Sequence, residues 1–415
     1  MLAIQENYDE IPWHTLTGKN GDLQNPGAGG KPPAVQLFHR RHIFAAAGSA
    51  KRLFEVQNPM QKPSVIYIGP FPKPVHGQSL ATERLYALLT DNGIAVQAVD
   101  TGESAGGFLG KCTRVIRLCK SLWFAARDAD WLYISVNSGK GLVFSELQAR
   151  LGRRYQKRLI LHHHVYRYIG EYDEAMAKLA DTAGSEAIHL TNCDDMAELL
   201  KARYSGVGEA LGYGNAGFVD PKLMELPTKE GAADTISLGH MSNLTVDKGV
   251  GRAIATFEAA LEKGLNVTLL LAGPYGDPEA RTLVENASCK HSERIKYLGP
   301  VYGDEKTEFF AKLDVFLFPT RYKNEAGPIV VLEAMAAGVP TISTDQCCIP
   351  SMLSDGGGLS LKMNDPDFIK LSIEYLEHYM VDPAGASSGA RRRYRNLLSE
   401  QKVREQQLLT LLSSN

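Results

Sequence analysis

The chain has 415 residues, of which 44% are hydrophobic and 22% charged, and its formal net charge is -2 at pH 7. This length predicts two domains with cores of their own, and the charge balance excludes a polybasic nucleic-acid binder, so we expect no nucleic-acid partner. No apolar run of about 18 residues suggests a spanning helix, and the acidic N-terminus lacks a signal-peptide core, so we expect a cytoplasmic protein.

Six cysteines are spread along the chain, and none stands in a C-x-x-C pair. This pattern favours neither a zinc site built from such pairs nor a disulfide framework, so we expect reduced thiols. The six are Cys112, Cys119, Cys193, Cys289, Cys347 and Cys348.

Composition divides the chain into five parts. Residues 1–62 hold a Gly- and Pro-rich stretch without periodicity and are expected to form an N-terminal extension. In 63–215, short apolar runs alternate with amphipathic segments, which is typical of a parallel sheet with helices on both faces. Strands are expected at 65–69, 94–100, 131–136, 158–162 and 187–191. Helices are expected at 80–92, 109–127, 141–152, 172–183 and 194–204.

Residues 205–234 are rich in Gly, Pro and Ala and show little periodicity, so the linker is placed within them, at 216–234. The alternation returns in a second domain, 235–383, and a helical segment follows at 384–415. Strands are expected at 235–239, 267–272, 295–298, 314–319 and 341–344, and helices at 248–263, 278–289, 306–313, 328–337 and within 365–412. The predicted fold class is α/β, with two doubly wound, Rossmann-like parallel-sheet domains facing a cleft. No G-x-G-x-x-G or P-loop motif is present, which disfavours a nicotinamide enzyme.

The stretch 316–340, FLFPTRYKNEAGPIVVLEAMAAGVP, contains the most informative pattern. An apolar strand leads into a loop with Glu325, and Pro328 opens a helix that carries Glu333. The N-terminus of that helix offers free N–H groups and a positive dipole end, which suit a diphosphate. Glu333, a turn and a half further along, is placed to accept hydrogen bonds from ribose hydroxyls.

Two glutamates with seven residues between them, followed by Ala-Met-Ala-x-Gly-x-Pro, resemble the donor-site signature of glycosyltransferase family 4, whose members are retaining enzymes of the GT-B fold. The resemblance implies that Glu325 faces the donor sugar and that Glu333 holds the ribose. That family often has Phe-Gly where Gly327 and Pro328 stand here. Because proline lacks an N–H, the phosphate contact is expected to use the amides of Ile329 and Val330, next to Gly327.

The loop 238–249, LGHMSNLTVDKG, resembles the family's Gly-Arg-x4-Lys-Gly loop, whose two cations grip the donor diphosphate. Lys248 matches the lysine and is expected to act in catalysis. Asn243 takes the arginine position, and a neutral amide cannot replace the bidentate guanidinium. Either Lys248 and the helix terminus suffice, or Arg321 or Lys323 supplies the second cation.

Two further segments carry candidate residues from the first domain. In the loop 69–79, GPFPKPVHGQS, Gly77 permits close approach of a ligand, and His76 and Gln78 are acceptor-side candidates. A Pro-stiffened connecting loop is the alternative. In the run 162–164, alternation along a strand places His162 and His164 on one face. The resemblance implies a cleft histidine here, catalytic for His164 or donor-binding for His162; a partly buried strand-end histidine is the alternative.

No metal site is expected, because adjacent histidines on a strand cannot share one ion and no partner ligands have suitable spacing. Two Asp-x-Asp triplets, at 128–130 and 365–367, are interpreted as helix caps. The helix with Lys111, Arg114, Arg117 and Lys120 has a cationic and an apolar face. It either covers the sheet or makes peripheral contact with an anionic membrane at its inner face.

The predicted function is transfer of a sugar from a nucleotide-sugar donor to a saccharide or lipid-linked acceptor, with retention of configuration. A role in cell-surface polysaccharide or glycoconjugate synthesis is expected. The nucleotide sugar is a co-substrate, so no cofactor is expected, and no metal requirement either. Two alternatives stay open: a GT-B nucleotide-sugar epimerase, and a catalytically weak binding or scaffold subunit, which the departures at Asn243 and Pro328 keep under consideration.

Overall fold

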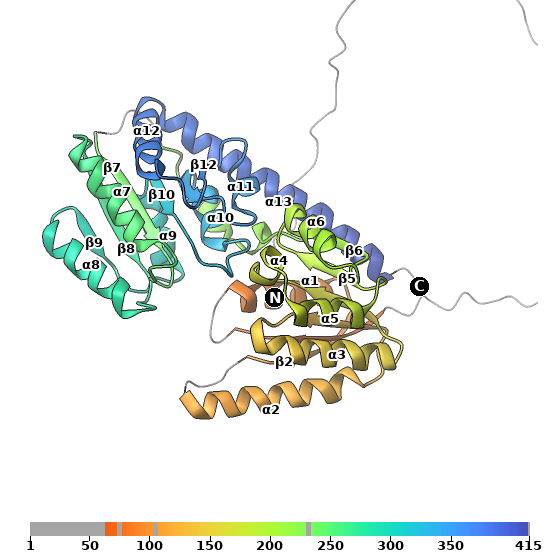
Figure 1. Ribbon diagram of the computed structural model, residues 1–415. Helices are drawn as coiled ribbons and strands as arrows, with labels where there is room; N and C mark the ends of the chain where they lie inside the picture. The colour runs from red at the N-terminus through yellow and green to blue at the C-terminus, as the bar shows by residue number, and fades with distance from the viewer. Residues whose placement is uncertain (1–62, 73–76, 103–106, 230–233, 414–415) are drawn as a thin grey trace, which may run out of the picture. The chain divides into compact units, whose positions relative to one another are not determined.

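The computed structural model describes residues 63–72, 77–102, 107–229 and 234–413. All of them belong to the compact unit Pro59–Asn415. The extension expected at 1–62 and the candidate His76 lie outside the described residues. Two six-stranded parallel sheets with helices on their faces form the framework (Figure 1), which confirms the predicted α/β class.

The first sheet has the order β2-β1-β3-β4-β5-β6, with every strand parallel to its neighbours. Its central strands are buried on both faces, and every residue of β3 is buried, as expected for a sheet covered on both sides. Its strands are β1 Ser64–Gly69, β2 Ala95–Asp100, β3 Trp131–Ser135, β4 Arg158–His162, β5 Ile188–Thr191 and β6 Glu209–Gly212. Its helices are α1 Gly77–Asp91, α2 Gly107–Ala125, α3 Leu142–Arg154, α4 Arg167–Gly170, α5 Glu174–Ala183 and α6 Asp194–Arg203.

The second sheet has the order β12-β11-β10-β7-β8-β9 and is again parallel throughout. Apolar side chains on β7, β8 and β10 pack against α7 and α8 in one core cluster. Its strands are β7 Ile236–Met241, β8 Val267–Ala272, β9 Ile295–Tyr297, β10 Val315–Phe318, β11 Thr341–Thr344 and β12 Gly358–Leu361. Its helices are α7 Val250–Glu262, α8 Pro278–Lys290, α9 Asp304–Lys312, α10 Ile329–Ala336, α11 Ile349–Leu353 and α12 Phe368–Val381.

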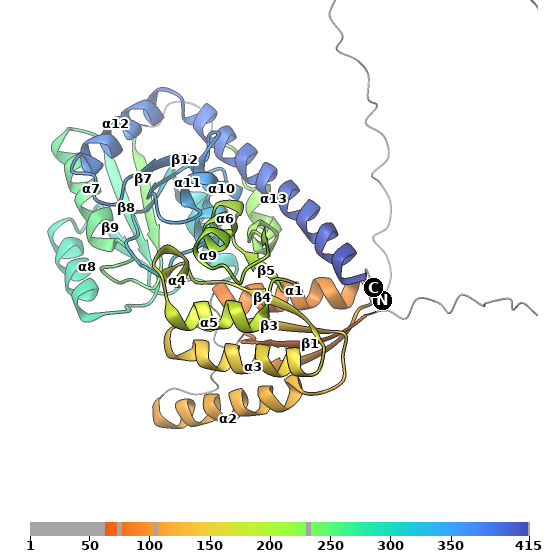
Figure 2. The same ribbon diagram turned by 45° about the vertical axis from the view of Figure 1, so that its right-hand side comes forward.

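The last helix, α13 Pro383–Ser413, contacts both sheet regions. Near its start, the Arg391 guanidinium donates to the carbonyl oxygen of Ala337 at 3.0 Å, after α10. Near its end, the carbonyl oxygen of Leu412 accepts from the indole N–H of Trp131 at 3.2 Å, on β3. Figure 2 shows the helix running from the second sheet region past the first. The predicted C-terminal helical segment therefore joins the two regions.

Three expectations about elements need correction. The stretch 205–234 contains β6, which is too short and too rich in Gly and Ala for its pattern to indicate a strand. The strand β12, with the four-residue sequence GLSL, is too short to stand out as an apolar run. The helical sequence expected within 365–412 is two helices, because Pro383 cannot continue α12 and begins α13 instead. In the described part of the chain, no helix combines the length and hydropathy needed to cross a bilayer.

Candidate donor site between the two sheets

A cavity of about 400 Å³ lies where strands of both sheets end. Its walls are residues that follow the carboxyl ends of parallel strands, which is where ligands bind in sheets of this kind. Its volume is within the usual range of small-molecule sites, about 300–1,000 Å³. From the first sheet region the lining residues are Gly77, Gln78, Leu80, His164, Asn192 and Asn215. From the second they include Met241, Ser242, Asn243, Lys248, Gly273, Tyr302, Lys306, Asn324, Glu325, Gly327, Ile329, Val330 and Glu333.

The two glutamates of the predicted signature reach this cavity from one strand-loop-helix unit. The strand β10 is buried along its whole length, and in α10 every residue from Val331 to Ala336 is buried. Glu325, in the loop, is only 8% exposed, and Glu333, in the helix, is 7% exposed. Carboxylates buried this far need a charged or hydrogen-bonding partner, and each of the two has a lysine.

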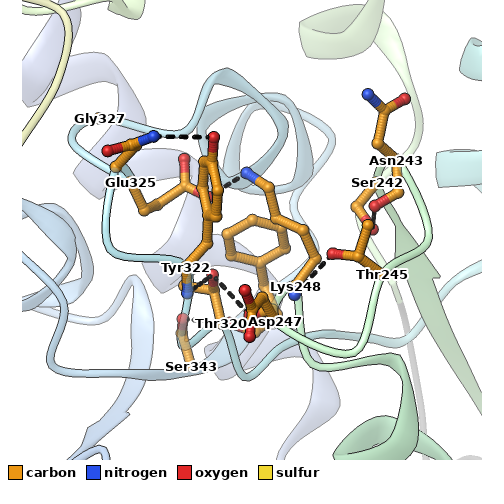
Figure 3. A network of polar contacts seen from close by, with 12 residues as sticks. Ser242, Asn243, Thr245, Asp247, Lys248, Thr320, Tyr322, Glu325, Gly327 and Ser343 are labelled. Atoms are coloured by element: carbon orange, nitrogen blue, oxygen red, sulfur yellow. Dashed lines mark hydrogen bonds and ion pairs between the residues drawn. The ribbon is translucent and has the colours of Figure 1, made fainter. Parts of the chain in front are cut away.

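Glu325 is paired with Lys248. The lysine ammonium donates to Glu325 Oε2 and lies 4.6 Å from the ring centroid of Tyr322, which Figure 3 shows beside it. Lys248 stands two residues before α7, and Gly249 between them adopts a left-handed φ of 89°. A Cβ on Gly249 would lie 2.3 Å from the carbonyl oxygen of Pro319, so only glycine lets the loop approach β10 this closely.

Glu333 is paired with Lys306, which comes from α9. The lysine Nζ lies 2.8 Å from Glu333 Oε1, and the lysine side chain is 29% exposed against 9% for the glutamate. Burial raises the pKa of Glu333, and the nearby Lys306 charge opposes that rise. The carboxylate expected to hold a ribose is thus held by a cation that also faces the cavity.

The start of α10 closes one side of the cavity. Pro328 is its N-cap residue, so the N–H groups of Ile329 and Val330 come first in the helix and have no carbonyl one turn earlier to bond. The carbonyl oxygen of Gly327 accepts a hydrogen bond of 2.8 Å from the Asn215 amide of the first sheet region. A Cβ on Gly327 would lie 2.9 Å from Asn192 Cβ, so the glycine allows the two walls to meet.

Arg321 and Lys323, the candidates for a second cation, have partners elsewhere. Neither residue lines the cavity: Arg321 donates to Asn364 Oδ1 at 3.0 Å, and Lys323 pairs with Glu171 at 3.0 Å on the surface. Asn243 does line the cavity, but its exposed side chain points away from Lys248 (Figure 3). Among the residues that the structure describes, Lys306 faces this space together with Lys248.

The first sheet region contributes the N-terminus of α1 and the end of β4. Gly77 and Gln78 line the cavity, and the Gln78 amide donates to Ser135 Oγ at 2.9 Å, which fixes it over β3. A Cβ on Gly77 would meet no atom within 4 Å, so no steric contact demands glycine there.

The histidine run alternates as predicted. The rings of His162 and His164 lie 3.9 Å apart on one face of the sheet, while His163 bonds His189 on the other at 2.9 Å. His164 lines the cavity, whereas His162 is fully buried behind it and bonds the Tyr133 hydroxyl at 2.8 Å. His162 therefore supports His164, and direct contact with a donor is not available to it.

Sequence reasoning missed four residues that shape this site. Lys306 pairs with Glu333, and Tyr322 lies against Lys248, the partner of Glu325. Asn192 and Asn215 line the wall that belongs to the first sheet region. The sequence places Lys306 at the start of a predicted helix and indicates no role for it, and the asparagines belong to loops with no recognisable pattern. The one available signal is position, since Asn192 directly follows β5 and Asn215 comes shortly after β6.

The expectation of six reduced thiols is wrong. Cys193, just before α6, is bonded to Cys348, just before α11. The Cys347 sulfur lies 3.6 Å from that of Cys348, and the three sulfurs are all within 4.8 Å of one another. The pattern gave no warning because 155 residues separate the bonded pair, and the fold alone brings them together.

Comparison with known proteins relates this chain to glycosyltransferases. Residues 226–392 match the family model described as Glycosyl transferases group 1. Curated relatives include the amylovoran biosynthesis glycosyltransferase AmsK of Erwinia amylovora, 24% identical over 32% of this chain and 34% of its own length. The capsular polysaccharide biosynthesis glycosyltransferase CapM of Staphylococcus aureus is 25% identical over 42% of this chain and 45% of its own length. The matches thus span less than half of these relatives.

Solved structures with the same fold cover more of the chain. Sucrose-phosphate synthase from Thermosynechococcus elongatus has a TM-score of 0.62, with 16% identity over 85% of this chain and 99% of that one. HepE of Anabaena in complex with UDP has a TM-score of 0.61, with 17% identity over 84% of this chain and 100% of that one. At such identities the likeness establishes the fold, which is the predicted two-domain GT-B arrangement.

The matched segment begins before β7 and ends within α13, so it contains the second sheet, Lys248, both lysine–glutamate pairs and the start of α10. Residues 226–392 of this chain therefore belong to the glycosyl transferases group 1 family.

Proposed function

We propose that this chain is a retaining glycosyltransferase that passes a sugar from a nucleotide-sugar donor to a saccharide or lipid-linked acceptor. The observation that carries the proposal is the meeting of Glu325, Glu333, Lys248 and the start of α10 in one cavity. The relatives named for amylovoran and capsular polysaccharide biosynthesis support a role in making cell-surface polysaccharide or glycoconjugate.

The donor would lie with its diphosphate at the start of α10. The amides of Ile329 and Val330 and the positive end of the helix dipole face that position. Glu333 would accept hydrogen bonds from the ribose hydroxyls, while Lys306 keeps its carboxylate charged. Because the HepE structure contains UDP, a uridine diphosphate sugar is the first donor to test.

The transfer step breaks the bond between the anomeric carbon and the diphosphate oxygen and forms one to the acceptor oxygen. The acceptor hydroxyl proton passes to the leaving phosphate, and retention requires attack from the leaving-group face. Negative charge grows on that phosphate, where Lys248 and the helix amides would stabilise it, at about 3 kcal/mol for each well-placed donor. Glu325 and His164 would orient the sugar, Gly77 would lie against the donor, and Gln78 would be on the acceptor side.

A metal-independent reaction is part of the proposal. Lys248 and Lys306 supply two positive charges at the cavity, which is the electrostatic role that a divalent ion takes in other phosphate sites. Addition of a chelator should then leave the rate of transfer unchanged.

Calorimetric titration with nucleoside diphosphates and nucleotide sugars, combined with assays of donor hydrolysis and transfer, tests the proposal. We expect one nucleotide to bind near micromolar and Glu333→Gln to weaken it more than about tenfold (~1.4 kcal/mol). Glu308→Gln, an exposed glutamate on α9, is the matched control and should bind normally. Donor binding without turnover would favour the scaffold alternative, and epimerised donor without acceptor would favour the epimerase. If no nucleotide binds, the proposed donor site is wrong.

Peripheral membrane contact through α2, in a protein that works at the cytoplasmic face, belongs to the same proposal. This helix lies at the outer side of the first sheet region in both views (Figures 1 and 2). Ile116 and Trp123 are 66% and 61% exposed, and Lys120 and Arg127 stand beside them as cations. Exposed apolar side chains flanked by basic ones suit an anionic bilayer surface. Co-sedimentation with anionic vesicles and not with neutral ones would support membrane contact, and Trp123→Ser should abolish it.

A further inference from the structure

Three cysteine sulfurs meet at the junction of the two sheet regions, close to the donor cavity. The Cys193–Cys348 bond links the segment after β5 of the first sheet to the segment after β11 of the second. The Cys347 thiol lies beside it, at 3.6 Å from the Cys348 sulfur. No step of the proposed transfer uses any of the three.

Each end of the bond is tied to a wall of the donor cavity. Cys193 directly follows Asn192, which lines the cavity and lies against Gly327. On the other side, the Cys348 N–H donates to the carbonyl oxygen of Ala326 at 3.3 Å, in the loop that carries Glu325. Breaking this bond therefore affects both walls directly, because Cys193 adjoins Asn192 in the chain and Cys348 is hydrogen-bonded to Ala326.

The bond borders a second cavity, which shares Asn192, Asn215 and Gly327 with the donor cavity. Cys193 is partly exposed and lines this second cavity of about 540 Å³, bounded by α6, α11 and α13. Cys348 is fully buried, so an incoming thiolate can attack only the Cys193 sulfur. Burial raises the pKa of the Cys347 thiol, which keeps it protonated and a poor nucleophile. Exchange must therefore begin with a thiol from outside.

We propose that the Cys193–Cys348 bond is a reversible redox clamp between the two walls of the donor cavity, opened by a dithiol reductant. One thiolate of the reductant attacks the Cys193 sulfur and displaces Cys348, which takes up a proton. The second thiol then attacks the mixed disulfide and releases Cys193 as a thiol. The reductant leaves as its own disulfide, and two electrons pass to the protein.

The clamp should act on the exchange of ligands. Enzymes of this kind close around their substrates and reopen to release products, and release often limits turnover. With the bond intact, the walls stay together, so the cavity is preformed and binds a nucleotide more tightly. Reduction frees the walls, which weakens binding and speeds turnover. This functional consequence rests on the proposed function, whereas the existence and motion of the clamp do not.

Peptide mapping of the full chain under non-reducing conditions tests the bond itself. We expect a cross-linked peptide containing Cys193 and Cys348 after oxidation, its loss with dithiothreitol, and its return when the reductant is removed. Hydrogen exchange should then be faster for the backbone of 319–328 in the reduced form. Absence of the cross-link, or equal exchange in both forms, overturns the proposal, and neither measurement depends on nucleotide binding.

Nucleotide affinity and turnover test the consequence. On reduction we expect the dissociation constant for UDP to rise by more than about threefold. The rate of donor hydrolysis should rise by a similar factor, as for a release-limited enzyme. Cys193→Ser, at a partly exposed position, should behave as the reduced form and ignore dithiothreitol. Cys289→Ser removes an exposed thiol elsewhere and should keep the full response. A Cys193→Ser variant that still responds to the reductant would overturn the assignment. If neither form binds any nucleotide, the proposed function fails, and peptide mapping with hydrogen exchange still decides the clamp.

Discussion

Replacing Lys306 with methionine should weaken nucleoside diphosphate binding by way of Glu333. The Glu333 carboxylate is 7% exposed within an apolar helix, and Lys306 lies 2.8 Å from it. Burial raises the pKa of Glu333, Lys306 is the main influence that lowers it, and Asp220 adds to the rise. Without the lysine the pKa therefore moves further up, and the carboxyl group takes a proton closer to neutral pH.

The expected loss is about 2 kcal/mol, or roughly thirtyfold in the dissociation constant. Two unit charges about 4 Å apart interact by about 4 kcal/mol at an effective dielectric constant near 20. Part of that is offset by the cost of taking the pair out of water. The lysine side chain keeps 29% of its surface exposed, which weakens the pair further. The expected loss of about 2 kcal/mol therefore lies between the interaction energies typical of exposed ion pairs and of fully buried ion pairs.

The affinity of Lys306→Met for UDP should change with pH in a definite direction. The ribose hydroxyls are expected to donate to the ionised carboxylate, so affinity in Lys306→Met should improve as the pH rises through the raised pKa. The loss relative to the unmodified protein should be largest at the acid end. Calorimetry with UDP from about pH 5.5 to about pH 8.5 covers this range. Lys306→Arg keeps the charge and should lose far less.

A double variant decides whether the effect passes through Glu333. In a Glu333→Gln background the lysine has no charge to compensate, so Lys306→Met should add little. If the two losses are additive, or if the loss is the same at every pH, the reasoning is refuted. Lys306 would then bind the nucleotide directly.

Three further predictions follow from the same geometry. Lys248→Met should lower kcat by about 10²–10³-fold, as for loss of one electrostatic donor; because Glu325 then loses its cation, the thermal denaturation midpoint should fall as well, and kcat is compared at a temperature where the variant is folded. Gly327→Ala should weaken UDP binding by about tenfold, because its Cβ would lie 2.9 Å from Asn192 Cβ; calorimetry that finds normal affinity contradicts this. Burial lowers the pKa of four histidines, to about 4 for two of them. Below pH ~6.5 the unfolded chain binds more protons than the folded one, so the free energy of unfolding should fall towards pH ~4, by up to about 1.4 kcal/mol per pH unit for each group. Denaturation midpoints that stay constant over that range would contradict it. These histidines are His162, His163, His189 and His240.

Most strands could be predicted because buried parallel strands are short apolar runs with clear ends. The ranges expected for β4, β8 and β11 coincide with the observed ones. The strand β6, with the sequence EALG, lacks any such run, and its pairing with β5 defines it. For strands of this kind, long-range hydrogen bonding decides what the local sequence does not.

The candidate site likewise has residues that the local sequence predicts and residues that only the fold brings together. Glu325 and Glu333 belong to one strand-loop-helix unit, so their spacing already predicts that both face the same edge of the sheet. Lys306 lies 27 residues before Glu333 on another helix, and only the tertiary fold brings its ammonium to the carboxylate. The Cys193–Cys348 bond joins two regions and is further still from any local pattern.

The two lysine–glutamate pairs bear on how a donor enters. Both carboxylates of the cavity are compensated before any ligand arrives, so the cost of burying them is met when the chain folds. In the proposed complex, a diphosphate would bring new negative charge to Lys248, and that lysine would then share its hydrogen bonds between Glu325 and the phosphate. The hydrogen bond from Lys248 to Glu325 would then weaken, so Glu325 would become a stronger acceptor for the hydroxyls of the sugar. Because the charges are fixed in place beforehand, donor binding exchanges partners within a preorganised set, which is the arrangement that favours stabilisation of a developing phosphate charge.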